Sequence, residues 1–430
     1  MRKKILNLFN FLLKHLAKAT IKKYNPRIIG ITGSVGKTTT KDAIYTVLKS
    51  AGLQARATGG NLNNETGMPL VILGDYKRSG GALFLTGAIL RGLFNLIRRN
   101  RNYPKILILE YSADKPGDLD YLISIARPDM AVVTAIGQTP VHIEFYQNVE
   151  QVILEKSKLV EAVRPGGNVI LNADDPDVAG MANRAKAKVK TYGFTDSADV
   201  ELKDFRNKTN GLVPIGTGFS IKVSGESVPV EMRGVLGKSG AYATGAATVA
   251  GIIVGLTLGE INKALLSYKG EKGRTKIIEG IKETYIIDDT YNASPESTKN
   301  ALDILKSLRA KRKIIVMGDM LELGEHSEAI HKEIGEIVAR VAHVLITVGP
   351  YARLLGETAI RKGLPDDDVY FFDKSGEAGL KLNEILDTGD LILVKGSQSM
   401  RMERVVKSIM KNPQEASRIL VRQYGKWLKS

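Results

Sequence analysis

The chain of 430 residues contains no cysteine, which excludes disulfide bonds, thiolate metal sites and cysteine nucleophiles. It also lacks a hydrophobic run long enough to cross a bilayer. The apolar run LFLTGAILRGLFNLI at residues 83–97 is interrupted by Arg91 and is shorter than the ~20 residues that a spanning helix needs. The N-terminus has no unbroken apolar core with a small-residue cleavage site, so we expect no secretory signal. These absences fit a reducing, cytoplasmic location.

Acidic residues are missing from two segments. Residues 1–27 contain eight Lys and Arg, and residues 76–109 contain seven, which accounts for nearly all of the net charge of +16. Such a basic surface favours phospholipid headgroups, nucleotides or nucleic acid, although it can equally serve solubility alone. Nucleic acid is the least favoured partner, because no recognisable binding module or aromatic–basic interleaving accompanies the charge.

The N-terminal stretch KKILNLFNFLLKHLAKATIKK has the spacing of an amphipathic helix. Its polar face carries Lys and Asn, and its apolar face carries Ile5, Leu8, Phe9, Leu12 and Leu16. Such a helix can lie peripherally on an anionic membrane, at its inner face, or pack against the body of the protein. The sequence leaves both possibilities open.

From Arg27 onward, apolar runs alternate with helical patterns, which predicts a mainly parallel α/β sheet covered on both faces. Between residues 200 and 235 short Gly- and Val-containing runs predict a small antiparallel insertion. After Arg274 the strand–helix alternation restarts. We therefore predict a basic helix over 1–26, a P-loop ATP-binding domain over 27–272 and a Rossmann-like α/β domain over 273–430. The segment 416–430 is predicted to form one more basic helix.

The stretch GITGSVGKTTTKDAI at residues 30–44 follows a strand and opens a helix. Backbone N–H groups of such a loop, together with the positive end of the helix, form an anion site. The spacing is T-G-x-x-G-K-T-T rather than the strict G-x-x-x-x-G-K-[ST], because position 31 is Ile. We predict that Lys37 reaches the terminal phosphates and that the Thr38 hydroxyl ligates Mg²⁺. The predicted nucleotide loop consists of Thr32, Gly33, Ser34, Val35, Gly36, Lys37, Thr38 and Thr39.

Further motifs follow in order. The first half contains G-N-L-N-N-E-T-G-M-P-L, the strand-end Glu110, H-I-E-F-Y, E-K-S-K-L and N-A-D-D-P. The second half contains G-R-T, I-D-D-T-Y-N-A-S-P, G-D-M-L-E-L-G-E and V-K-G-S. Over residues 27–410 this series resembles the Mur ligases. The later motifs resemble the MurF branch, which joins D-alanyl-D-alanine to a UDP-MurNAc-tripeptide.

The resemblance implies ATP-dependent amide bond formation through an acyl phosphate, between a cell-wall precursor and an amino acid or dipeptide. It implies ATP and two Mg²⁺ ions as cofactors. Glu110 and His142 would be metal ligands, and Lys156 would correspond to the lysine that Mur ligases carbamylate to help hold the second ion. Arg274 would reach the ATP phosphates, Asp289 the ribose, and Tyr291 and Asn292 the nucleoside. The implied substrate residues are Asn61, Asn63 and Asn64 in the Asn-rich loop and Asp319, Glu322, His331, Lys395 and Ser397 in the second domain.

The sequence departs from the MurF pattern in two places. MurF enzymes carry a further N-terminal domain for the UDP portion of the acceptor, whereas here 26 residues precede the first strand. At GKSGAYA, residues 237–243, Ser239, Gly240 and Ala243 replace polar residues that approach the adenine in the family, so we expect a relaxed nucleotide preference.

Several alternatives remain open. They are another Mur-type ligase with a different or lipid-linked acceptor, a folylpolyglutamate synthase, or a non-catalytic nucleotide-binding partner in wall synthesis. The motifs of the second half favour MurF over folylpolyglutamate synthase. Joint retention of Lys37, Glu110, His142 and Lys156 argues against a non-catalytic role, since a scaffold needs no metal ligands.

Overall fold

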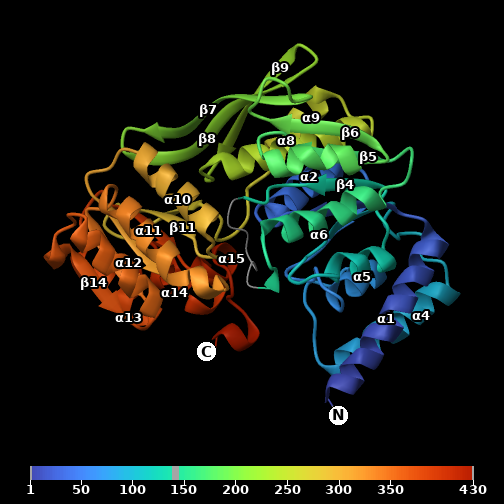
Figure 1. Ribbon diagram of the computed structural model, residues 1–430, viewed down its shortest axis with the longest axis horizontal. Helices are drawn as coiled ribbons and strands as arrows, with labels where there is room; N and C mark the ends of the chain where they lie inside the picture. The colour runs from blue at the N-terminus through green and yellow to red at the C-terminus, as the bar shows by residue number, and fades with distance from the viewer. Residues whose placement is uncertain (1, 138–144, 429–430) are drawn as a thin grey trace.

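The computed structural model of the chain describes residues 2–137 and 145–428. The predicted metal ligand His142 lies outside these residues. Two α/β bodies lie side by side, the first drawn from blue to yellow-green and the second in orange and red (Figure 1). This arrangement confirms the fold class expected from the sequence.

The first body contains a nine-stranded sheet in the order β2-β3-β1-β4-β5-β6-β7-β8-β9. Its parallel strands are β1 (Arg27–Thr32), β2 (Ala55–Ala57), β3 (Ile106–Glu110), β4 (Met130–Val133), β5 (Asn168–Asn172) and β6 (Lys188–Gly193). The antiparallel strands are β7 (Val200–Asn210), β8 (Val213–Val223) and β9 (Glu226–Arg233). The predicted antiparallel insertion is therefore present, and it extends the same sheet, because β7 pairs in parallel with β6.

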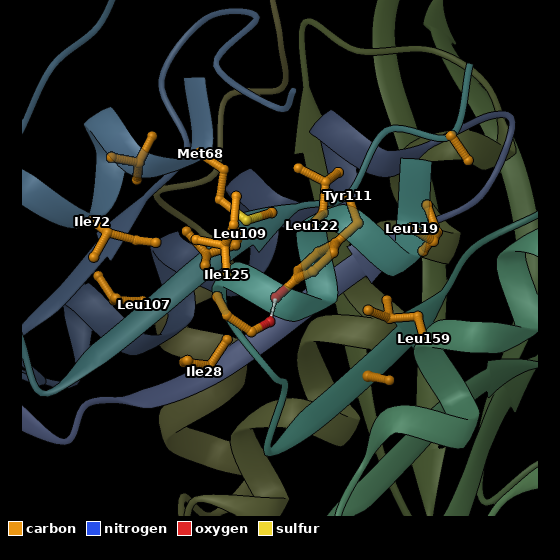
Figure 2. Close-up of a cluster of buried hydrophobic side chains, with 14 of the residues drawn as sticks. Ile28, Met68, Ile72, Leu107, Leu109, Tyr111, Leu119, Leu122, Ile125 and Leu159 are labelled. Atoms are coloured by element: carbon orange, nitrogen blue, oxygen red, sulfur yellow. Dashed lines mark hydrogen bonds between the residues drawn. The ribbon is translucent and has the colours of Figure 1, made fainter. Parts of the chain in front are cut away.

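Helices cover both faces of this sheet, so its central strands are apolar throughout. The helices are α1 (Arg2–Tyr24), α2 (Lys37–Ser50), α3 (Gly67–Leu73), α4 (Ala82–Ile97), α5 (Asp118–Ile125), α6 (Val149–Ala162), α7 (Pro176–Gly180), α8 (Lys238–Ile253) and α9 (Leu258–Leu265). Alternate residues of β1 point to opposite cores: Ile28 packs on one face and Ile29 on the other. Figure 2 shows the first core, in which the Tyr111 hydroxyl donates a hydrogen bond of 2.5 Å to the Ala126 carbonyl.

The second body contains a six-stranded sheet in the order β10-β11-β15-β12-β13-β14, in which only the β10–β11 pair is antiparallel. Its strands are β10 (Lys276–Glu279), β11 (Tyr285–Asp289), β12 (Lys313–Gly318), β13 (Val344–Val348), β14 (Val369–Phe372) and β15 (Leu391–Lys395). One face is covered by α10 (Pro295–Ser307), α11 (Ser327–Ala339) and α12 (Pro350–Arg361). The other is covered by α13 (Ser375–Ile385) and α14 (Glu403–Ile409).

The prediction of a basic helix over residues 416–430 is wrong. Among residues 416–428, which the structure describes, only those of α15 (Ala416–Ile419) are α-helical, and a 3-10 turn follows at Gly425–Leu428. Arg422 has a left-handed backbone (φ 55°), which a continuous helix does not allow. Its buried guanidinium donates to the carbonyls of Thr290 and Tyr291 and pairs with Glu403. These tertiary contacts fix the segment in an irregular conformation.

Helix α1 is present as predicted and packs against the body of the first domain. Leu13 and Ala17 are fully buried, whereas Ile5, Leu8 and Leu12 of the predicted apolar face remain exposed. Phe9 and Leu16 of that face are partly buried and pack against the core, so the buried side of α1 overlaps the predicted apolar face only in part. Within the described residues, none of the helices combines the length and apolarity that crossing a membrane requires.

Candidate active site

The loop between β1 and α2 has the shape of an anion site. Gly33 and Gly36 have φ values of +141° and +88°, and a Cβ atom at Gly33 would come within 2.0 Å of the Thr134 hydroxyl. Gly36 caps α2 without a side-chain hydrogen bond to the first helical N–H groups. Uncapped N–H groups and the helix dipole together attract phosphate at this end of the helix.

The Lys37 side chain folds back over this loop. Its ammonium donates to the carbonyls of Gly33 at 2.6 Å and Ser34 at 3.4 Å. Burial lowers the pKa of Lys37, and the nearby Glu110 carboxylate partly opposes that effect. The positive charge is thus held at the start of α2, where the sequence predicts the terminal phosphates.

Glu110 ends β3 beside the same loop, because β1 and β3 are parallel neighbours. The Thr38 hydroxyl donates to its Oε2 atom at 3.3 Å, and the Lys41 ammonium lies 3.4 Å from Oε1, an atom that accepts no hydrogen bond. Hydroxyl and carboxylate oxygens suit Mg²⁺. The described residues contain no cluster of three His, Asp or Glu side chains able to hold a metal, so an ion here would also need phosphate or water oxygens.

Lys156 lies on α6 with only 3% of its surface exposed. Burial, and secondarily the charge of Lys37, lower the pKa of Lys156 to about 7, while Asp114 and Glu155 act in the opposite direction. The neighbouring Glu155 has a structural role, since its carboxylate accepts hydrogen bonds from the backbone of Gly117 and Leu119 at the start of α5. At neutral pH a substantial fraction of Lys156 is therefore the uncharged amine.

Replacing Lys156 by methionine is expected to stabilise the protein in CO₂-free, metal-free buffer. The folded state binds the Lys156 proton less tightly than the unfolded state, where its pKa is about 10.4. The loss of folding stability that results from burying the charged lysine is therefore fully present below pH 7. This loss decreases as the pH rises toward 10.4. We expect a gain of a few kcal/mol in unfolding free energy at pH 6.5 and a much smaller gain at pH 9.5, measured by urea denaturation. An equal gain at both pH values would contradict this account.

Residues of both domains line one cavity of about 500 Å³. Gly36 and Thr39 reach it from the phosphate loop, and Arg274, Asp289 and Lys395 from the second domain. A hydrogen bond also joins the two domains, because the Tyr291 hydroxyl donates to the Asn61 side chain at 2.6 Å. Within the second domain, the Arg274 guanidinium stacks 4.2 Å from the centre of the Tyr291 ring. The structure thus brings Arg274 and Asp289 to the cavity of the phosphate loop.

Asp289 and Lys395, predicted for different ligands, pair with each other at 2.5 Å. Lys395 also donates to the Asn292 carbonyl, and Asp289 accepts from the Thr275 backbone. Burial lowers the pKa of Lys395, and the attraction of Asp289 opposes that effect. Any ribose hydroxyl that binds Asp289 would therefore share its carboxylate with Lys395.

The remaining predicted substrate residues of the second domain shape the loop after β12. Asp319 accepts a hydrogen bond from the Ala352 backbone, and the Ser397 hydroxyl accepts one from the Leu321 backbone.

The buried His331 accepts a hydrogen bond from the Met320 N–H through Nε2 and donates one from Nδ1 to the Ser327 carbonyl. Burial raises the pKa of Asp319 and lowers that of His331, so the imidazole stays neutral. Glu322 adopts a left-handed backbone (φ 66°) in this loop.

The Asn-rich loop of the first domain has mixed roles. Asn61 bonds to Tyr291, as described above. The Asn64 side chain accepts from the Gly67 backbone at the start of α3, and the Asn63 carbonyl accepts from the Ser112 backbone. Asn61 thus ties the loop to the second domain, and Asn63 ties it to the segment that follows β3.

Sequence reasoning missed part of the cavity wall. Asp174 accepts from the Tyr242 hydroxyl at 2.9 Å, and Asn207 of β7 accepts from the Gly237 backbone at the start of α8. Both line the cavity together with Ser239 and Gly240, the positions at which the sequence predicts altered base contacts. N-A-D-D-P signals Asp174, whereas Asn207 lies in an antiparallel strand that has no sequence motif.

A phosphate loop on one α/β domain, facing an arginine and an acid–lysine pair on a second, defines a two-domain nucleotide-dependent enzyme. Residues 31–84 and 90–251 match the Mur ligase middle domain, and residues 273–398 match the Mur ligase glutamate ligase domain. The chain belongs to the Mur ligase family of ATP-dependent peptide ligases.

Its relatives include UDP-N-acetylmuramoyl-tripeptide–D-alanyl-D-alanine ligases. That of Bacillus subtilis (strain 168) is 32% identical over 93% of this chain and 79% of the relative. That of Escherichia coli (strain K12) is 28% identical over 90% of this chain and 77% of the relative. The crystal structure of the MurF ligase from Thermotoga maritima in complex with ADP matches with a TM-score of 0.77 and 27% identity, covering 94% of this chain and 84% of that one.

Proposed function

We propose that this enzyme joins D-alanyl-D-alanine, or a similar amine, to the carboxylate of a cell-wall peptide precursor at the expense of ATP. The observation that supports this most is the cavity shared by the phosphate loop, Arg274 and the Asp289–Lys395 pair. Similarity to a UDP-N-acetylmuramoyl-tripeptide–D-alanyl-D-alanine ligase over more than nine-tenths of the chain supports the choice of amine.

The reaction consists of two displacements. A carboxylate oxygen of the acceptor attacks the γ-phosphorus of ATP, and ADP leaves. The amine then attacks the acyl carbon, loses a proton, and expels phosphate with the electrons of the C–O bond. Positioning and charge neutralisation dominate such phosphoryl transfers. Lys37, the start of α2 and Arg274 supply positive charge around the phosphates, and closure of the second domain would exclude water from the acyl phosphate.

The residues that would hold Mg²⁺ are Thr38 and Glu110, whose oxygens adjoin the phosphate loop. Such an ion would supply further charge neutralisation at the phosphates. Lys156 is suited to carbamylation because its low pKa leaves much of it as a nucleophilic amine. Attack of that neutral amine on CO₂, with loss of one proton from nitrogen, forms the C–N bond of an anionic carbamate. Starting from the protonated lysine, two protons are released and a buried cation becomes an anion. The assignment of His142 to a second ion rests on the sequence resemblance alone.

A phosphate-release assay with panels of acceptors and amines, followed by mass analysis of the products, tests the proposal. We expect release only when a precursor peptide and an amine are both present, with a product mass equal to their sum minus water. The panel should include UDP-linked and lipid-linked tripeptide acceptors, since these distinguish the proposal from the alternative Mur-type ligase. No turnover with any pair would indicate a non-catalytic nucleotide-binding protein instead.

Relaxed base preference is a separate expectation. The cavity wall near α8 presents Ser239 and Gly240 where the family places polar side chains, so fewer groups distinguish adenine from guanine. One good base-specific contact favours the correct base by about 1–3 kcal/mol. With such contacts missing at these positions, we expect turnover with GTP to be within about tenfold of that with ATP. Strict ATP dependence in the phosphate-release assay would contradict this expectation.

A further inference from the structure

Helix α4 presents an apolar face to solvent along its whole length. Leu83 and Ile97 are 89% and 86% exposed, and the exposed residues between them include Leu90, Leu93 and Phe94. These positions recur at helical spacing, whereas Leu85, Ala88 and Gly92 on the opposite side are buried against the domain. A contiguous exposed apolar face of this kind is unusual for a monomeric protein and marks an interaction site.

Helix α1 lies beside α4 and enlarges this face. The Lys23 ammonium donates to the carbonyls of Asn95 and Leu96 near the end of α4, and the Leu16 side chain approaches Gly92. The exposed apolar residues of α1 are Ile5, Leu6, Leu8, Phe11 and Leu12. Both helices lie at the lower right of the first domain as drawn in Figure 1. We call these exposed residues of the two helices the α1/α4 surface.

The charges that accompany the α1/α4 surface are positive. Its exposed basic residues are Lys4, Lys18, Lys22, Arg91, Arg98, Arg99 and Arg101. Residues 1–27 and 76–109 contain no acidic residue that could neutralise them locally. Apolar side chains next to unneutralised Lys and Arg match an anionic lipid bilayer, whose acyl region accepts the former and whose headgroups attract the latter.

We propose that the α1/α4 surface docks the protein on an anionic membrane, with both helices lying in the interfacial plane. This docking does not depend on the ligase reaction. It does place the Asn-rich loop close to the membrane side of the molecule, because the Thr66 hydroxyl of that loop donates to the Asn10 side chain on the inner face of α1 at 2.7 Å.

Co-sedimentation of the full-length protein with vesicles tests the proposal. We expect binding to vesicles of phosphatidylglycerol and phosphatidylcholine, weaker binding in 1 M NaCl, and little binding to pure phosphatidylcholine. The double variant Arg98→Ser/Arg99→Ser should weaken the partition coefficient roughly fivefold for each charge removed. The triple variant Leu83→Ser/Leu90→Ser/Ile97→Ser should abolish binding.

Control variants change exposed apolar or basic residues elsewhere in the chain. These are Leu266→Ser/Leu380→Ser for the apolar variant and Arg309→Ser/Lys311→Ser for the charge variant, and both should bind like the parent. Circular dichroism and thermal melting confirm that each variant is folded. Absence of binding to anionic vesicles would overturn the proposal, as would binding that the α1/α4 variants leave unchanged. Self-association in light scattering that the triple variant removes, without vesicle binding, would make this surface an interface between copies of the chain.

Discussion

Replacement of Lys37 by alanine is expected to lower the rate of ATP-dependent ligation by about 10²–10³-fold. The Lys37 ammonium is held at the start of α2 by the Gly33 carbonyl, close to where the γ-phosphate would lie. It would offset negative charge that develops as the phosphoryl group is transferred, and residues 32–39 contain no second lysine. Initial-rate measurements of phosphate release with saturating acceptor and amine give the comparison.

Lys49→Ala is the matched control for this variant, because Lys49 lies exposed in the last turn of the same helix. It should retain the parental rate. The folded state of Lys37→Ala should be at least as stable as the parent, since burial of the ammonium opposes its charge. A Lys37→Ala enzyme that keeps a rate within tenfold of the parent would show that the phosphates bind elsewhere.

Replacement of Lys156 by alanine is expected to lower turnover by at least about 100-fold, if the carbamate of Lys156 supplies negative charge at the metal site. The parent enzyme should then depend on dissolved CO₂. Its rate should fall in CO₂-depleted buffer and return on addition of bicarbonate, whereas the rate of the variant should not respond. Mass spectrometry at mild pH can detect the added carbamate directly.

The pH dependence has a definite sign. Only the neutral amine attacks CO₂, and the pKa of Lys156 is about 7, so carbamylation should weaken as the pH falls below 7 and should no longer be limited by protonation above about 8. Lys158→Ala is the control, because that side chain lies partly exposed on α6 and pairs with Asp120 and Glu155 instead. A Lys156→Ala enzyme with parental turnover, or a parent rate independent of CO₂, would refute the role.

The two Lys156 substitutions test different consequences of the same buried amine. Methionine should raise the free energy of unfolding, and alanine should lower turnover. A buried lysine whose pKa is lowered by burial fits a functional group that must be a neutral amine near neutral pH.

The sequence predicted the site residues whose conformation depends mainly on residues close to them in the chain. The phosphate loop is a local structure, in which two glycines with left-handed backbones and the start of α2 lie within eight residues. The strand-end position of Glu110 also follows from its own apolar strand. For the same reason the amphipathic character of α1 was readable, although the side that it buries was predicted only in part.

Other features depended on segments far apart in the chain. The Asp289–Lys395 pair joins adjacent parallel strands more than one hundred residues apart, and Asn207 meets α8 only through the extended sheet. The irregular C-terminal segment is held by Arg422 against Thr290 and Tyr291, a contact that local helical propensity does not anticipate.

By itself the sequence therefore determined the order of strands and helices, the phosphate loop and the kind of chemistry, because hydrophobic periodicity and glycine geometry act over a few residues. Tertiary structure alone decided which charges meet, how strongly Lys156 is buried and which face of α4 stays in solvent. Those properties depend on desolvation and packing between distant segments, and both are set only when the two sheets and their helices come together.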